Sequence, residues 1–249
     1  MTVGEDSVRG ADEARRGTTE GNGCRDLPPR SGQHADAWTA RLLTFSAGAV
    51  NAWGFLSLGG VFTSVVTANS ALTGVGLGGA DPTLGALAAV AVLCYVLGAA
   101  GAAWAASHAP RGGRLCPVDF LLLELLLLWT VVGWWLAVHG DPSGWERTAM
   151  LGMVAAAMGC QNAGVRVALG ARVPTAYLTG LLTGAVAEAV TARRAQWPAL
   201  VTLTLLVLGA AAATLLERLL PGAVPLLPAL LVTAAWLNAH TRTGARLGP

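Results

Sequence analysis

Long apolar runs dominate the chain after Trp38. Six of them approach or exceed the roughly 20 residues that a helix needs to cross about 30 Å of hydrocarbon. This pattern predicts an all-α, polytopic membrane helix bundle rather than a very apolar soluble one. The six runs cover residues 41–60, 83–107, 117–138, 146–168, 197–217 and 222–240.

Two further segments, 62–79 and 174–191, are compatible with helices but are more polar and richer in glycine. The first contains TSVVTANSALTG, from Thr63 to Gly74, in which six of the twelve side chains are hydroxyls or amides. At about 1.5 Å per residue, each segment would reach about 27 Å as a helix. Length alone therefore leaves open whether the two segments span the membrane or enter it and return.

An internal repeat with an offset near 111 residues relates the two polar segments to each other. The matching pairs are GAVNAWG with GCQNAGV, VFTSVVTA with VPTAYLTG after a one-residue gap, and LGAAGAAWAASHAP with LGAAAATLLERLLP. The first pair places Asn51 on Asn162, and the second places Thr63 on Thr175. Because these matches occur in the same order in both halves, they indicate an ancient duplication.

Arginine placement indicates how the two repeats, 38–140 and 146–240, are oriented, because short arginine-rich loops stay on the cytoplasmic side. If all eight segments span, five arginines fall outside and six inside, which is no bias. If the two polar segments re-enter, nine fall inside and two outside, so six full spans are favoured. The nine are Arg41, Arg111, Arg114, Arg166, Arg172, Arg193, Arg194, Arg242 and Arg246, and the two are Arg147 and Arg218.

Three spans in each repeat would invert the second repeat relative to the first. Inverted repeats with discontinuous helices that meet near the bilayer midplane are an architecture of transporters and channels. Irregular backbone at this depth is tolerated only inside protein or along a watery cavity. The alternative is that the small residues serve close helix packing, as the spacings Gly74–Gly78 and Gly180–Gly184 allow. The predicted pathway residues of the first segment are Thr63, Thr67, Asn69, Ser70 and Thr73, opposed by Thr175, Tyr177, Thr179 and Thr183 of the second.

The stretches GAVNAWGFLSLGGVFTSVVTANSALTG and MGCQNAGVRVALGARVPTAYLTGLLTG resemble the signatures of the YoaK family of multi-pass bacterial membrane proteins. That family is classed as a domain of unknown function, and the resemblance covers about residues 40–240. It implies a multi-pass membrane fold and brings no established substrate. Two positions depart from the family pattern: Asn51 replaces the usual Asp, and Ala68 replaces the usual Gly.

Ionisable residues inside the spans are functional candidates because their burial in a membrane is costly. Glu124 lies about two turns inside the run 117–138 with leucines on both sides, so it needs a partner or a cavity. We consider it a candidate for proton coupling. Asp119 is expected near the interface, and Glu188 in a salt bridge with the two arginines that follow it at 193 and 194.

Three amides also lie inside predicted spans. Asn51 is in the first span, and Gln161 and Asn162 lie at the related point of the predicted span 146–168. Amides at these points could contact a substrate, or they could form hydrogen bonds between helices. We therefore include all three among the predicted pathway residues and leave both roles open.

Composition narrows the choice of function. The polar, acidic residues 1–37 are predicted to be a disordered tail, and residues 241–249 a short C-terminal tail. The chain lacks the motifs of common enzymes, its four histidines are dispersed, and its four cysteines show no paired spacing. We therefore expect no enzymatic activity, no cofactor and no metal. The formal net charge of +2, without a basic patch, argues against nucleic-acid binding.

These observations predict an uncharacterised bacterial protein of the cytoplasmic membrane with both termini in the cytoplasm. Its expected function is that of a transporter or channel that passes a small polar solute through a midplane site at the repeat interface. The alternative is a non-transporting interaction or assembly protein with a packed helical core. An intramembrane enzyme that uses Glu124 would need a second catalytic group nearby. The lipid bilayer is the predicted partner, and a homo-oligomer is compatible with the sequence.

Overall fold

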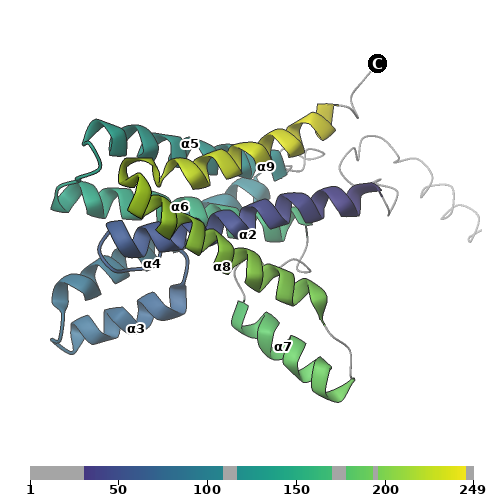
Figure 1. The fold of residues 1–249 in the computed structure, drawn as a ribbon, viewed down its shortest axis with the longest axis horizontal. Helices are drawn as coiled ribbons and strands as arrows, with labels where there is room; N and C mark the ends of the chain where they lie inside the picture. Colours follow the sequence, from purple (N-terminus) through teal and green to yellow (C-terminus); the bar gives the residue numbers. More distant parts are fainter. Residues whose placement is uncertain (1–30, 109–116, 170–177, 193–195, 245–249) are drawn as a thin grey trace, which may run out of the picture.

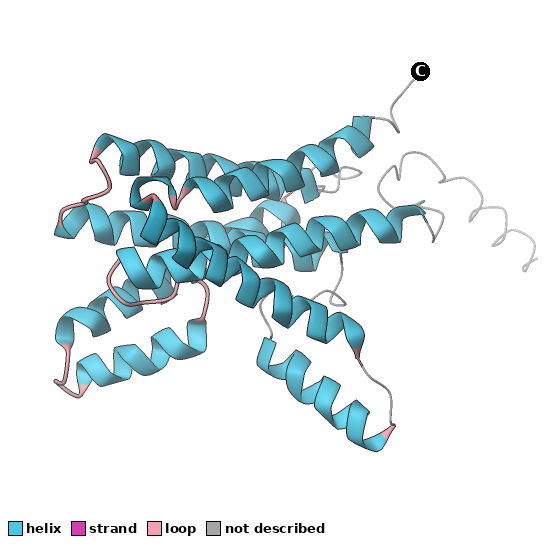
Figure 2. Cartoon of the chain, in the orientation of Figure 1, coloured by secondary structure: helices cyan, strands magenta, loops and turns pink. Residues whose placement is uncertain are grey.

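The computed structural model describes residues 31–108, 117–169, 178–192 and 196–244, in which all regular secondary structure is helical (Figure 1, Figure 2). The helices are α2 (Ser31–Ser57), α3 (Val66–Leu77), α4 (Pro82–Ser107), α5 (Pro117–Ala137), α6 (Gly144–Leu169), α7 (Leu178–Thr191), α8 (Trp197–Leu219), the short 3-10 helix η1 (Pro221–Ala223) and α9 (Leu226–Gly244).

Each of the eight predicted segments overlaps one of these α-helices. The two polar segments hold the shortest: α3 has 12 residues and α7 has 14, which is about 18 and 21 Å of helix. Both fall short of the roughly 30 Å of hydrocarbon. Residues 31–37, predicted as the end of a disordered tail, instead form the first two turns of α2. Extending an existing helix costs far less than starting one, so the helix continues into polar sequence.

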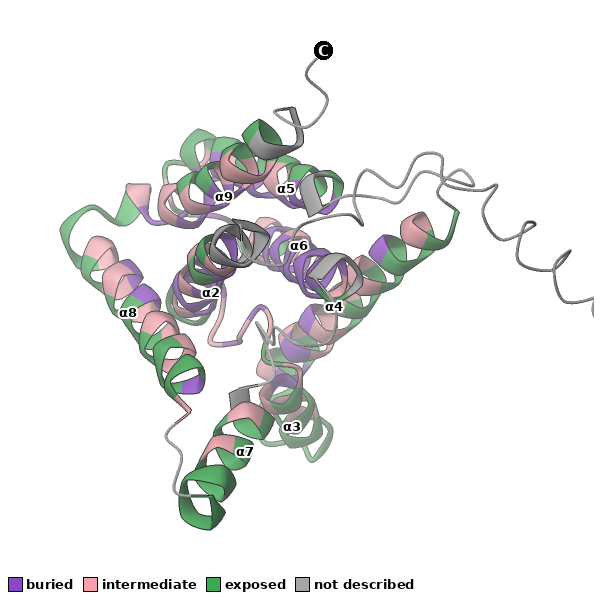
Figure 3. Cartoon of the chain, turned by 90° about the vertical axis from the view of Figure 1, so that its right-hand side faces the viewer, coloured by how far each residue is buried: buried purple, intermediate pink, exposed green. Residues whose placement is uncertain are grey.

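Helices α2 and α6 form the centre of the bundle, and α4, α5, α8 and α9 lie around them (Figure 3). The two central helices contribute many of the buried side chains, among them Leu43, Met150 and Met158. On α2, Trp53 packs edge-on against Trp135 of α5, with ring centroids 5.3 Å apart. The core therefore lies along the two helices that the other four surround.

The surrounding helices supply the surfaces that suit lipid. Within the described part of the chain, four segments are long and apolar enough to cross a membrane by length and composition: Pro82–Ser107, Asp119–Ala137, Trp197–Leu219 and Pro221–Thr241. Their exposed side chains include large hydrophobic residues such as Leu97. Neither α2 nor α6 is in this set, because both carry Ser, Thr, Asn or Gln among their Ala and Gly. A central helix that faces protein rather than lipid can hold such residues.

Side-chain contacts fix the relative directions of the helices. α2 and α8 run parallel. Gly48 of α2 lies beside Leu206 of α8, and further along both helices the Ser57 hydroxyl of α2 donates to Glu217 of α8. α4 and α6 also run parallel, because Gly152 lies beside Cys94 and Gly159 beside Ala99.

Further contacts relate these pairs to the other two helices. α5 runs parallel to α2, since the start of each lines one pocket and Trp53 meets Trp135 near their ends. α6 runs antiparallel to α5, because Trp134 of α5 donates to Glu146 at the start of α6. α9 runs antiparallel to α2, because Asn238 donates to Thr39. Thus α2, α5 and α8 run one way, and α4, α6 and α9 run the other way.

Two helix crossings bring backbones into contact at glycines. A Cβ atom on Gly98 of α4 would lie 2.0 Å from the Ala156 carbonyl oxygen of α6, and one on Gly209 of α8 would lie 2.0 Å from the Phe45 carbonyl oxygen of α2. Gly98 and Gly209 are 111 residues apart, which is the offset of the internal repeat. The α4–α6 crossing therefore recurs as the α8–α2 crossing, and each pairs a helix of one half with a helix of the other.

Candidate functional site

The first polar segment contains a non-helical loop, residues 58–65, that turns back along α2. The turn is made at Gly59 and Gly60, whose φ angles of 111° and 77° favour glycine. The loop then reaches Asn51, because the Thr63 N–H donates to the Asn51 Oδ1 at 3.1 Å. Asn51 lies six residues before the end of α2, about 9 Å along the helix axis. The loop thus returns into the bundle before α3 begins.

The Asn51 side chain anchors this loop. Its Oδ1 accepts the N–H groups of Thr63 and Ser64 and the Thr63 hydroxyl, at 3.0 to 3.2 Å. Its Nδ2 donates to the Ala47 carbonyl and to the Ser64 hydroxyl, both at 2.8 Å. An amide can fill both roles, whereas an ionised carboxylate could not donate to Ala47. Every donor and acceptor of the Asn51 amide is used within the chain.

Asn69, in the first turn of α3, holds the loop from its other side. Its Oδ1 accepts the Phe62 N–H at 3.2 Å, and its Nδ2 donates to the Phe62 carbonyl. The half-buried Thr73 donates its hydroxyl to the Asn69 carbonyl at 2.8 Å. The structure therefore brings together Asn51, Thr63 and Asn69 in one buried cluster. The prediction omitted Ser64, although its position beside Thr63 in the polar stretch marks it.

The other predicted pathway residues of α3 and α7 lie at the periphery. Thr67 and Ser70 are exposed on α3, and Thr179 and Thr183 are exposed on α7. In Figure 1 both short helices lie outside the central bundle, and α7 makes few contacts, mainly with α8. The predicted residues Thr175 and Tyr177 lie outside the described residues.

Two of the glycines that were considered for close helix packing do not pack against another helix in the part of the chain that the structure describes. A Cβ atom on Gly74 of α3 or on Gly184 of α7 would meet no atom within 4 Å. Close packing of α3 occurs instead at Gly76, where a Cβ atom would lie 2.5 Å from Gly85 of α4. The segment thus uses one glycine for packing against its neighbour and leaves others on an open surface.

A second polar cluster lies between α5 and α6. Glu124 is completely buried, Gln161 is 1% exposed, and the Gln161 Nε2 donates to the Glu124 Oε1 at 2.6 Å. The Glu124 Oε2 and the Gln161 Oε1 have no hydrogen-bond partner among the described residues. The sequence marked both residues separately, and the structure pairs them.

Asn162 forms a hydrogen bond to α4. Its Nδ2 donates to the Tyr95 hydroxyl of α4 at 3.1 Å. Tyr95 was missed in the sequence, although a tyrosine in an otherwise Ala-, Val- and Leu-rich helix needs a partner for its hydroxyl. The amide of Asn162 therefore joins α6 to α4.

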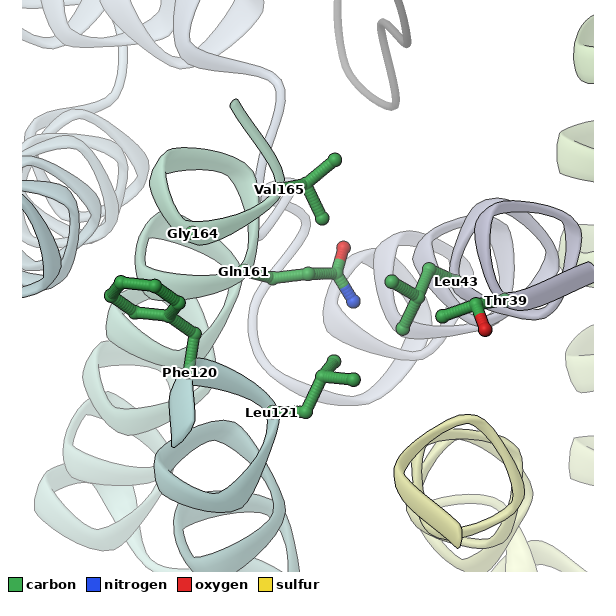
Figure 4. A pocket seen from close by; sticks show the side chains of 7 residues that line it. All are labelled: Thr39, Leu43, Phe120, Leu121, Gln161, Gly164 and Val165. Atoms are coloured by element: carbon green, nitrogen blue, oxygen red, sulfur yellow. The ribbon is translucent and has the colours of Figure 1, made fainter. Parts of the chain in front are cut away.

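A pocket opens beside the second polar cluster, at the end of the bundle where α2 and α5 begin and α6 ends (Figure 4). In Figure 4 the Gln161 side chain extends from α6 toward α2, between Leu43 and Leu121. Apart from Gln161 and the hydroxyl of Thr39, the lining is apolar. It consists of Thr39, Leu43, Phe120, Leu121, Gln161, Gly164 and Val165.

The remaining charged candidates lie at helix ends. Asp119 is exposed near the start of α5, as expected of an interfacial residue. Glu188 of α7 accepts a hydrogen bond from the Gln196 side chain. The arginines predicted to pair with Glu188 lie outside the described residues. Within the described ranges, no group of three His, Cys, Asp or Glu side chains could hold a metal ion.

Apolar outer helices around a core that holds buried amides and the buried Glu124 define a helical membrane protein. The chain belongs to the family described as "Protein of unknown function (DUF1275)", whose model matches residues 39–238. This match confirms the resemblance to the YoaK family. Among curated proteins and solved structures, none matches the chain significantly.

Proposed function

We propose that this protein is a transporter or channel for a small polar solute, built from two inverted repeats of three spans and one re-entrant segment. The observation that carries the proposal is the loop 58–65, which returns to the depth of Asn51 before α3 leads outward again. Non-helical backbone at such a depth requires surrounding protein or a water-filled cavity. Discontinuous helices of this kind form the solute sites of many transporters.

The helix directions support re-entry of both polar segments. Because α4 runs opposite to α2, the connection that contains α3 leaves and returns to the same end of the bundle. Since α8 runs opposite to α6, the same holds for the connection that contains α7. Neither short helix is long enough to cross the bilayer alone.

The directions also support inversion of the repeats. The related helices α2 and α6 run in opposite directions, as do α4 and α8, and α5 and α9. This orientation agrees with the arginine distribution, which places nine residues on the side of the N-terminus and two on the other. We place both termini in the cytoplasm and the protein in the bacterial cytoplasmic membrane. The exposed hydroxyls of Thr67, Thr179 and Thr183 would then line the solute pathway.

A packed, non-transporting membrane protein is the second candidate. It is favoured by the Asn51 and Asn69 amides, whose hydrogen bonds are all made within the chain, and by the glycine crossings that bring backbones into contact. In this case α3 and α7 would cover the bundle or bind another protein, and no solute would pass. Measurements of topology and of solute flux separate the two candidates.

The topology is tested by single cysteines at Ala80 and Ser107, both exposed, in a variant without native cysteines. An impermeant thiol reagent applied to intact cells should label position 80 and spare position 107. The reverse pattern would mean that the segment containing α3 spans the membrane, and the inverted arrangement would be wrong.

Solute passage is tested in vesicles that contain the purified protein, by light scattering after an osmotic step with glycerol, urea or glycine. We expect faster volume recovery than in empty vesicles for at least one of these probes. Thr183→Val should lower the rate several-fold, whereas Thr130→Val should not. The control is matched, because both threonines are exposed and donate to the carbonyl four residues earlier. Rates equal to those of empty vesicles for all three probes would favour the packed, non-transporting protein.

A further inference from the structure

In the buried pair of Glu124 and Gln161, one oxygen of each side chain lacks a hydrogen-bond donor in the described part of the chain. The Gln161 Nε2 donates to the Glu124 Oε1, which leaves the Glu124 Oε2 and the Gln161 Oε1 without partners. If Glu124 were ionised, both atoms would be acceptors without a donor. A single proton on Oε2 supplies the missing donor, because a neutral acid and an amide can form two hydrogen bonds to each other. A buried polar group without a partner is costly, so the neutral acid is favoured.

Within the described residues, no positively charged side chain forms an ion pair with the Glu124 carboxyl group. On α6, the titratable residue beside it is Cys160, whose thiol points to the Phe120 carbonyl, while Arg166 lies on the turn that follows. On α9, His240 stacks on Trp236 near the C-terminal end of that helix, at the same end of the bundle as the pocket. A carboxylate in this place would be an uncompensated buried charge.

The internal repeat indicates that packing alone does not require this pair. The position of α2 related to Gln161 is Val50, which is also completely buried. The same helix position is therefore filled by an apolar side chain in one half and by an amide bonded to an acid in the other. Polar groups retained at such a place in a membrane protein commonly mark a proton or ion site.

The pocket gives this pair a route to one end of the bundle. Gln161 lines the pocket together with Phe120 and Leu121, which lie one turn before Glu124 on α5 (Figure 4). Thr39 also lines the pocket, and its hydroxyl, which accepts from Asn238, can donate to water. Rotation of the Gln161 amide would thus place Glu124 in contact with water at the end of the bundle where α2 begins.

We propose that Glu124 and Gln161 form a proton-binding site, in which a neutral Glu124 is paired with the Gln161 amide and exchanges its proton with water through this pocket. On release, the O–H bond of the carboxyl breaks, the proton passes to water, and the carboxylate keeps the electron pair. Coupling of this proton to solute movement rests on the proposed transport function, whereas the protonation itself does not.

The test is infrared spectroscopy of the full-length protein in lipid vesicles near neutral pH. We expect a C=O stretching band of a protonated carboxyl group that shifts on transfer to D₂O, is lost in Glu124→Gln and persists in Asp119→Asn. Asp119 is a suitable control because it lies on the same helix but is exposed. Absence of the band, or its persistence in Glu124→Gln, would show that Glu124 is ionised and would overturn the proposal.

Two further measurements test the pairing and the route. Gln161→Val, which copies the residue at the related position, should shift the band to higher frequency because the carboxyl loses its amide partner. An unchanged band would refute the acid–amide pair. In the wild-type protein, a hydrophobic carbodiimide should modify Glu124, as mapped by mass spectrometry, and modification at other carboxyls alone would also overturn the proposal. None of these results depends on whether solute flux is found.

Discussion

The glycine crossing between α4 and α6 provides a direct test of the fold. A Cβ atom on Gly98 would lie 2.0 Å from the Ala156 carbonyl oxygen, about 1.4 Å closer than the 3.4 Å at which ordinary contact begins. The obstacle is backbone, so no side-chain rotation can relieve it. Gly98→Ala must therefore separate the two helices, and overpacking of this kind costs about 1–3 kcal/mol.

The matched control is Gly101→Ala on the same helix, where a Cβ atom would meet nothing within 4 Å. Both substitutions gain up to about 1 kcal/mol of helix propensity, so their difference reports the crossing itself. We expect Gly98→Ala to be less stable than Gly101→Ala by on the order of 1–3 kcal/mol. Because the crossing recurs at Gly209, Gly209→Ala should show a similar loss.

The assay is reversible unfolding in mixed detergent micelles, followed by tryptophan fluorescence and circular dichroism. Equal stability of Gly98→Ala and Gly101→Ala would refute the close crossing. A loss at Gly98 without a loss at Gly209 would refute the equivalence of the two crossings, and with it the strongest structural support for the repeat.

Two further predictions concern the loop and the core. Asn51→Ala removes the acceptor of the Thr63 and Ser64 N–H groups, each worth about 1–3 kcal/mol if buried without a partner, and should speed amide exchange at both residues. Asn51→Asp keeps the acceptor but turns an oxygen toward the Ala47 carbonyl, so its stability should lie between those of Asn51→Ala and the wild type. Wild-type exchange rates in both variants would show that Asn51 does not anchor the loop. Trp135→Ala, at the Trp53 contact, should destabilise the fold by about 3–5 kcal/mol in the same unfolding assay. Trp197→Ala, at a side chain 70% exposed, should change stability by less than about 0.5 kcal/mol, and similar losses for both would refute the assigned core.

The candidate site was predictable only in part. The polar stretch TSVVTANSALTG marked Thr63 and Asn69 because hydroxyls and amides stand out in a lipid-compatible sequence. The sequence also marked Asn51 and left open whether it contacts a substrate or forms hydrogen bonds within the protein; in the structure it anchors the loop 58–65. That contact arises from the turn at Gly59 and Gly60, which brings Thr63 back to Asn51. No spacing rule for a straight helix would join these residues.

The sequence by itself determined the class of protein and the approximate position of each helix, because the apolar length that a helix needs in a bilayer is a local property of the chain. It also revealed the offset of 111 residues at which the glycine crossings recur. Only the tertiary structure decided that Gln161 meets Glu124 and that Asn162 meets Tyr95. Such pairs depend on how each helix is rotated about its axis and where it crosses its neighbour. The pattern of hydropathy along the chain specifies neither the rotation of a helix nor its crossing point.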